Sequence, residues 1–198
     1  IGLCEVGCFC NEGYIFSDDT YSECILIEDC SEPSLCDEGY TEIDGECYYQ
    51  SDLDVLQQFI DNSQNGENPP PSDLSPIHLG CQEWENGRLV SLKSSDDNFY
   101  QYWETQRCWV NYTLSGEITG DMESLVNLTY LDLHFNQLSG WIPYELYSII
   151  HLDLGSNLFT NNILPQIGIS LTTLEFLDLS WNEFYGEIPT LQYEHYTK

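Results

Sequence analysis

The stretch Leu128-Thr129-Tyr130-Leu131-Asp132-Leu133-His134-Phe135-Asn136 decides the fold, because its pattern recurs twice further along the chain. It returns as IIHLDLGSN at 149–157 and as LEFLDLSWN at 174–182, after steps of 21 and 25 residues. A period in this range indicates stacked structural repeats, in which no single unit can bury its own apolar edge. We therefore expect the last third of the chain to form a solenoid.

Alternation within each unit predicts a short strand. The two leucines of the LDL triplet are two residues apart, so both point to one face and the aspartate between them points to the other. We expect the leucines to be buried and the aspartates to remain in solvent. An asparagine stands three positions after the second leucine, where its side chain can satisfy backbone groups as the strand turns away. Stacked copies of this residue should form a ladder of Asn136, Asn157 and Asn182.

A second signature follows each asparagine. It reads Leu138-Ser139-Gly140-Trp141-Ile142-Pro143 in one repeat and Phe184-Tyr185-Gly186-Glu187-Ile188-Pro189 in another, and 114–118 is the tail of an earlier copy. The combined pattern LxxLxLxxNxLSGxIP resembles the leucine-rich repeat of the plant-type class over residues 114–190. This resemblance implies an α/β solenoid with short parallel strands.

The preceding segment resembles the N-terminal cap of such proteins. Residues 51–62 predict a helix that begins at Ser51 as N-cap and carries Leu53, Leu56 and Ile60 on one face. A Pro-rich break spans 65–76, and a Cys81/Trp84 stretch and a strand at 87–92 come next. The resemblance implies a Cys81–Cys108 disulfide. Residues 93–109 fit no repeat and are interpreted as an insertion.

Residues 1–47 hold seven of the nine cysteines and a different duplication. Two Cys-x-x-Gly-Tyr motifs each lead to a second cysteine, from Cys10 to Cys24 and from Cys36 to Cys47, which suggests two closed hairpins. The segment resembles the second half of a trypsin-inhibitor-like module and, less closely, the end of an EGF-like module. That resemblance implies a Cys10–Cys24 disulfide. It also implies that the disulfide partners of Cys4, Cys8 and Cys30 would precede Ile1, so the chain is interpreted as truncated. The expected domains are 1–47, a cap at 51–110 and repeats at 111–198.

The amino-acid composition indicates the cellular location and excludes some classes of binding partner. Dense cysteines are typical of disulfides in oxidising compartments, so we expect a secreted or cell-surface protein. Sequons at Asn111 and Asn127 are compatible with this setting. A net charge of −30 argues against nucleic acid as a partner. No run approaches the roughly 20 apolar residues that span a bilayer.

The exposed columns of the repeat sheet are the expected binding face. Flat aromatic side chains beside a carboxylate row suit protein contacts or sugar rings, although the aspartate column alone is near-consensus in the family and has a structural explanation. The residues predicted to bind are Tyr130, Asp132, His134, Phe135, His151, Asp153, Phe176, Asp178 and Trp181.

Catalysis and metal binding have little support in the sequence. The four histidines show no metal-type spacing, and no GxSxG, P-loop or GxGxxG motif is present. His134, His151, Asp132 and Asp153 could meet on adjacent strands, but the repeat pattern explains that adjacency without a metal. Acidic density permits calcium, yet its only compact candidates, 17–19 and 96–98, are better interpreted as solvated turns. We therefore expect no enzyme and no cofactor.

The favoured function is non-catalytic extracellular recognition or adhesion through the concave face, with a protein or glycan ligand. The alternative is a structural subunit of an extracellular filament or coat, because both ends of the chain look unfinished and open solenoid ends invite further copies. Protease inhibition by the cysteine-rich module is weaker, since no basic side chain is available there for a trypsin-type pocket.

Overall fold

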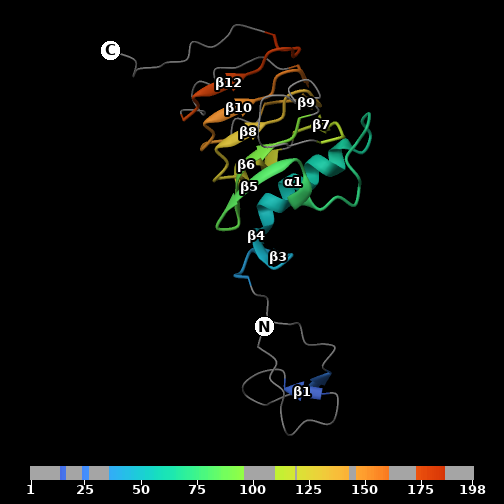
Figure 1. Ribbon diagram of the computed structural model, residues 1–198, viewed down its shortest axis with the longest axis vertical. Coiled ribbons are helices and arrows are strands. Elements are labelled where there is room, and N and C mark those ends of the chain that lie inside the picture. Colours follow the sequence, from blue (N-terminus) through green and yellow to red (C-terminus); the bar gives the residue numbers. More distant parts are fainter. Residues whose placement is uncertain are drawn as a thin grey trace, which may run out of the picture. The chain divides into compact units, whose positions relative to one another are not determined.

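The chain forms two compact units, residues 1–47 and 48–198, in the computed structural model (Figure 1). The structure describes residues 14–16, 24–26, 36–95, 110–118, 120–142, 146–160 and 173–185. At 14–16, 24–26 and 120 it describes the backbone alone.

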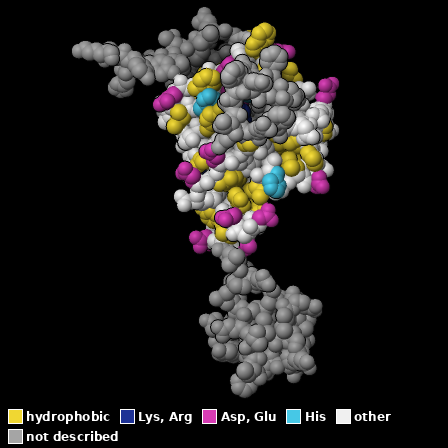
Figure 2. Space-filling model, viewed as in Figure 1, with side chains coloured by type: hydrophobic (Ala, Val, Ile, Leu, Met, Phe, Trp, Pro, Cys, Tyr) yellow, Lys and Arg dark blue, Asp and Glu magenta, His cyan; other side chains and the backbone are white. Residues whose placement is uncertain are grey.

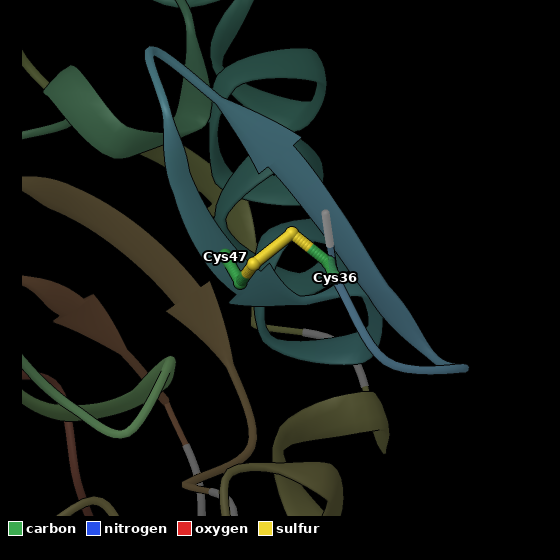
Figure 3. Close-up of a disulfide and its surroundings, with 2 residues drawn as sticks. All are labelled: Cys36 and Cys47. Carbon is green, nitrogen blue, oxygen red and sulfur yellow. A yellow bond between two sulfur atoms is a disulfide. The ribbon is translucent and has the colours of Figure 1, made fainter. Parts of the chain in front are cut away.

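Two small hairpins precede the helix, and the second of them ends at Tyr49, two residues into the second unit. Strand β1 (Tyr14–Phe16) pairs antiparallel with β2 (Cys24–Leu26). Strands β3 (Tyr40–Ile43) and β4 (Glu46–Tyr49) form the second two-stranded sheet, and both turn residues between them have positive φ, as a two-residue Asp-Gly turn requires. A disulfide joins Cys36 to Cys47 with their Cα atoms 5.6 Å apart (Figure 3), which is the closure expected for this motif. Cys10 lies outside the described residues, so its pairing with Cys24 stays a prediction.

Helix α1 (Gln50–Ser63) opens the second unit and buries the predicted apolar face of Leu53, Leu56 and Ile60. The expectation that Ser51 caps this helix is wrong. The N-cap is Tyr49, which makes no side-chain cap hydrogen bond. Its N–H donates to the Gly87 carbonyl at 2.7 Å, so strand-like backbone pairing continues to Tyr49 and the helix starts before Ser51.

A five-stranded sheet forms one side of the solenoid in the order β12-β10-β8-β6-β5 (Figure 1). The repeat triplets are the parallel strands β8 (Tyr130–Asp132), β10 (His151–Asp153) and β12 (Phe176–Asp178), aligned residue for residue. Strand β6 (Arg88–Lys93) extends them in parallel, and β5 (Cys81–Glu85) adds an antiparallel edge. The prediction of parallel repeat strands is therefore confirmed.

The expected insertion begins later than predicted. Lys93 is the last residue of β6 and pairs with Asp132, and the Ser94 N–H donates to the Asp132 carbonyl at 2.9 Å. Strand β6 extends one residue beyond its last apolar residue, Leu92. Its backbone pairing with β8 does not depend on the apolar pattern of its side chains. Ser94 and Ser95 are buried, and residues 96–109 lie outside the described part of the chain.

A three-stranded parallel sheet forms the other side of the repeats. It consists of β7 (Ser115–Glu117), β9 (Gln137–Gly140) and β11 (Leu158–Phe159) in the order β11-β9-β7. Two 3-10 turns, η2 (Pro76–His78) and η3 (Gly120–Ser124), complete the described elements. The 14 residues of α1, the longest helix in these ranges, are too few and too polar to cross a bilayer.

The core is one apolar seam shared by the helix and the repeats. Four of the six leucines predicted to seal it are fully buried, namely Leu131, Leu133, Leu152 and Leu154. Leu177 and Leu179 are only partly buried. They belong to the repeat that contains β12, and among the described strands β12 has a neighbouring strand on one side only.

The asparagine ladder is present. The Asn157 side-chain oxygen accepts from the Leu138 N–H at 3.0 Å, and its Nδ2 donates to the carbonyls of Leu133 and Leu154. Asn136 and Asn182 make the equivalent bonds one repeat away. Each ladder asparagine follows a residue with left-handed backbone, and these residues are Phe135, Ser156 and Trp181 with φ of 52°, 54° and 54°. The ladder thus fixes the turn at which every repeat strand ends.

Candidate functional site

The sheet face carries a stack of three flat rings. Tyr130, His151 and Phe176 occupy equivalent positions on β8, β10 and β12. The His151 ring lies 4.2 Å from the Tyr130 ring and 4.1 Å from the Phe176 ring, with interplanar angles of 9° and 4°. Since both faces of the His151 ring are covered, its edge is the part left for contact.

Below these rings runs a row of carboxylates. Asp132, Asp153 and Asp178 are paired neighbours along the sheet. The Oδ1 atom of each accepts the backbone N–H two residues further on, at 3.3 Å for Asp132, 2.9 Å for Asp153 and 2.8 Å for Asp178. This bond fixes each side chain against the start of its own turn and engages one of its two oxygens.

Asp132 does not remain in solvent as the alternation predicted, because its residue is only 3% exposed. Its Oδ2 lies 3.5 Å from Lys93 Nζ, and its Oδ1 is hydrogen-bonded to His134 Nδ1. Burial alone would raise its pKa, but the His134 hydrogen bond and the charges of His134 and Lys93 bring the pKa of Asp132 below its ordinary value. A carboxylate can be buried here because two partly buried cationic or hydrogen-bonding side chains, Lys93 and His134, lie beside it.

Asp153 is in a different electrostatic setting. Burial and the like charges of Asp132 and Asp178 raise the pKa of Asp153, against the opposing effect of the Gly155 N–H. The nearest cationic candidate is His134 Nδ1, 4.0 Å from Asp153 Oδ2. This half of the row therefore lacks the cation that Asp132 has in Lys93.

Burial favours the neutral form of the His151 side chain. Burial lowers its pKa below the ordinary value of 6.5, although the carboxylates of Asp132 and Asp153 act in the opposite direction. Its ring therefore acts as an aromatic surface between Tyr130 and Phe176.

The four residues named as a candidate metal set are only partly brought together. Ligand atoms of Asp132, His134 and Asp153 all lie within 4.8 Å of one another, whereas His151 is not part of the group. Calcium prefers an all-oxygen ligand set, which this Asp-His-Asp group does not offer. The other calcium candidates, 17–19 and 96–98, lie outside the described residues.

Two further aromatic residues flank the carboxylates at the ends of the strands. Phe135 is 45% exposed and packs edge-on against His134 at 5.3 Å, and Trp181 is 84% exposed. The structure thus places all nine predicted binding residues on or directly after the same three strands. The sequence analysis missed Lys93, which lies on β6 and pairs in register with Asp132 on β8. Aligning Ser91-Leu92-Lys93 with the repeat triplets would have found it.

The remaining predicted residues lie away from this face. Asn111 and Asn127 are both exposed, and their glycosylation stays a prediction. Cys81 is disulfide-bonded. Its expected partner Cys108 lies outside the described residues, so the Cys81–Cys108 pair stays a prediction.

In-register parallel strands with buried leucines, closed by a buried asparagine ladder, define a leucine-rich-repeat solenoid. The family model described as Leucine Rich Repeat matches residues 127–149 and 173–191. Receptor-like protein 39 of Arabidopsis thaliana is 41% identical over 81 residues, which are 37% of this chain and 9% of the relative. Receptor-like protein 41 of the same plant is 38% identical over the same shares. The repeat region is thus similar to the leucine-rich repeats of these plant proteins, and the chain spans about a tenth of the length of these curated relatives.

A solved structure shows the same fold, and a second is similar in part. The crystal structure of PEPR1-AtPEP1 matches with a TM-score of 0.50 and 24% identity over 71% of this chain and 19% of that chain. The ectodomain of the receptor kinase SOBIR1 from Arabidopsis thaliana matches with a TM-score of 0.48 and 24% identity over 69% of this chain and 70% of that chain.

Proposed function

We propose that this chain is a non-catalytic, extracellular recognition module that binds a protein ligand on the exposed face of the sheet β12-β10-β8-β6-β5. The observation that carries the proposal is the ordered aromatic surface on that face. The stack of Tyr130, His151 and Phe176 stands on one side of the carboxylate row, and Phe135 and Trp181 stand on the other.

The energetics favour a contact surface. Aromatic side chains contribute most of the contact energy at protein interfaces, and they lose little conformational entropy when they are already held in place. The three stacked rings are held by one another and by the strand register. Phe176 is nonetheless 43% exposed, so the apolar surface of the stack reaches solvent. A preorganised surface of this kind costs less to bind than one that must be ordered first.

The disulfides, the sequons and the similar proteins support an extracellular location. A disulfide between Cys36 and Cys47 and a disulfide-bonded Cys81 fit an oxidising compartment. The two exposed sequon asparagines fit a secretory route. The curated relatives are named receptor-like proteins, which fits a role in recognition.

A protein and glycan array probed with the full chain tests this function. Binding to the strongest protein hit should fall about tenfold or more when Phe135 and Trp181 are both replaced by Ala, because each removes a large apolar contact. Trp141→Ala with Tyr147→Ala is the matched control, since these residues are 65% and 60% exposed but lie outside the five-stranded sheet.

Unchanged binding by the Phe135/Trp181 variant, or an equal loss in the control, would remove the sheet face from the proposal. If the hits that depend on these residues were all glycans, a glycan ligand would replace the protein ligand.

A further inference from the structure

Resting on the proposed function, we infer that the protein ligand presents an arginine side chain, whose guanidinium is held between the carboxylates of Asp153 and Asp178. The partner is thus a polypeptide segment with an exposed arginine, and not a neutral or acidic one. This commits the sheet face to an occupant of stated charge and geometry.

Cationic partners are unevenly distributed among the carboxylates of this face. Arg88 and Lys93 are the Lys and Arg residues in the described part of the chain, and both have carboxylate partners. Arg88 pairs with Asp52 at 2.8 Å, and Lys93 lies 3.5 Å from Asp132. No Lys or Arg pairs with Asp153 or Asp178 within the ranges that the structure describes. In a chain of net charge −30, a cation for these two carboxylates is best supplied by a partner.

The same preponderance of acid is visible on the surface. On the face drawn in Figure 2, acidic side chains are spread over the coloured part of the molecule, whereas dark blue Lys and Arg atoms are almost absent. Such a surface attracts cationic partners and raises their association rate at low salt.

A glycine lies between the two carboxylates. Gly155 occupies the position that His134 fills one repeat earlier and Ser180 one repeat later. A Cβ on Gly155 would lie 3.2 Å from Asp153 Oδ1 and 3.4 Å from Asp178 Oδ1, so any longer side chain would stand against both carboxylates. The backbone of Gly155 is not left-handed, so its conformation does not require glycine. This glycine leaves no side chain between the carboxylates of Asp153 and Asp178, although His134 Nδ1 approaches Asp153 Oδ2 to 4.0 Å from the preceding repeat; Asp132, by contrast, is hydrogen-bonded by His134.

The acceptor geometry of the two aspartates suits a guanidinium. Each aspartate gives its Oδ1 to a backbone N–H, at Gly155 and at Ser180, and no hydrogen bond to Oδ2 of either residue comes from the described residues. Neighbouring parallel strands are about 4.8 Å apart, which allows one planar guanidinium with five N–H donors to reach both side chains. A lysine ammonium is a single point and matches this pair less well.

The aromatic columns fit the stem of that residue and not its charged head. A cation prefers the face of an aromatic ring, and both faces of the His151 ring are covered by its neighbours. The stack therefore offers apolar edges to the aliphatic stem and the flanking residues, while the charge is directed to the carboxylates.

Selection from a random heptapeptide phage library tests the inference. The full chain is immobilised in 0.15 M NaCl with EDTA, beside Asp153→Asn/Asp178→Asn and the charge-matched control Glu67→Gln/Asp73→Asn, whose residues are exposed and off this face. Arginine should be enriched in peptides selected by the wild type and the control, and not in those selected by the double aspartate variant. Asparagine keeps the Oδ1 acceptor, so circular dichroism of that variant should be unchanged.

One selected peptide is then synthesised with its arginine, with lysine and with the neutral isostere citrulline. Citrulline should weaken binding about tenfold or more, and lysine should weaken it less, as expected for the loss of charge-assisted hydrogen bonds. Equal affinity for citrulline, equal enrichment of lysine, or an equal loss in the control variant would overturn the inference. Binding that needs a divalent cation in place of EDTA would also overturn it, because the carboxylates would then hold a metal.

These outcomes are separable from the test of the proposed function. If an array ligand depends on Phe135 and Trp181 but is indifferent to Asp153 and Asp178, the recognition role stands and the arginine assignment fails.

Discussion

Replacing Asp52 by Ala should destabilise the second unit more than any other single change to a charged residue in α1. Asp52 is fully buried and accepts from Arg88 Nε at 2.9 Å and from Arg88 Nη2 at 2.8 Å. Its Oδ2 also accepts the Leu89 N–H at 2.9 Å. Arg88 itself lies over the Tyr49 ring at 4.1 Å and donates to the Ser124 carbonyl. One carboxylate therefore connects the helix to strand β6.

The magnitude follows from what the change would leave behind. Removing one member of a buried ion pair leaves an uncompensated charge and costs about 3 to 5 kcal/mol. The side chain of Arg88 is 16% exposed, so some of that charge can be rehydrated and the lower end of the range is expected. The Leu89 N–H is buried and would add about 1 kcal/mol as an unsatisfied donor. We expect a loss of about 4 kcal/mol in the free energy of unfolding.

Urea unfolding followed by tryptophan fluorescence measures this loss, because all five tryptophans belong to the second unit. Asp54→Ala is the control. Asp54 is exposed on the same helix and accepts only from Gln50 in the described contacts, so its loss should be within about 0.5 kcal/mol. Asp52→Asn supplies a milder variant if Asp52→Ala does not fold.

A double-mutant cycle sharpens the test. Asp52→Ala combined with Arg88→Ala should cost less than the sum of the two single changes, since removing both partners leaves no unpaired charge. Additive losses, or a loss for Asp52→Ala no larger than that for Asp54→Ala, would show that the ion pair does not hold the helix to β6 and that the reasoning is wrong.

Three further predictions concern the ladder, the hairpin and the carboxylate row. Asn157→Ala should lower the free energy of unfolding by about 2 to 4 kcal/mol, because the Leu138 N–H and two buried carbonyls lose their partner; urea unfolding measures it, and a loss below 1 kcal/mol would contradict the ladder. Replacing Cys36 and Cys47 by Ala, which opens a closure of 11 residues, should destabilise the hairpin by about 3 kcal/mol and speed its limited proteolysis; an unchanged cleavage rate would contradict this. The folded-state pKa of Asp132 is lowered, so its carboxylate stabilises the fold above the unfolded-state value near 4, and this contribution is lost as pH falls through the lower folded-state pKa. Asp132→Asn should therefore cost stability at pH 7 and progressively less as the pH falls below about 4, and a pH-independent difference would refute the assignment.

The repeat architecture could be predicted because the physics is local and periodic. Leucines two residues apart and an asparagine at a fixed offset need only a parallel neighbour to become buried, and each repeat supplies that neighbour for the next. The strand register follows from the repeat, so the sequence alone aligns Tyr130 with His151 and His151 with Phe176.

The contacts that break the period could not be predicted in the same way. Asp52 and Arg88 are 36 positions apart and belong to no repeat, so their pairing depends on how the helix packs against β6. The burial of Asp132 depends on Lys93 and His134 in neighbouring columns, whereas the alternation rule treats all three aspartates alike. The helix start at Gln50 depends on the Tyr49 bond to Gly87, which lies outside the helix sequence.

The left-handed residues before the ladder asparagines imply a conflict between stability and surface chemistry. For a bulky side chain this backbone conformation costs about 1 to 2 kcal/mol, and glycine would relieve it. The solenoid nevertheless carries a phenylalanine and a tryptophan there, at φ of 52° and 54°. Trp181→Gly should therefore raise the free energy of unfolding of the repeats, while it removes an aromatic ring that is 84% exposed. A protein selected for durability alone would favour glycine at these two corners.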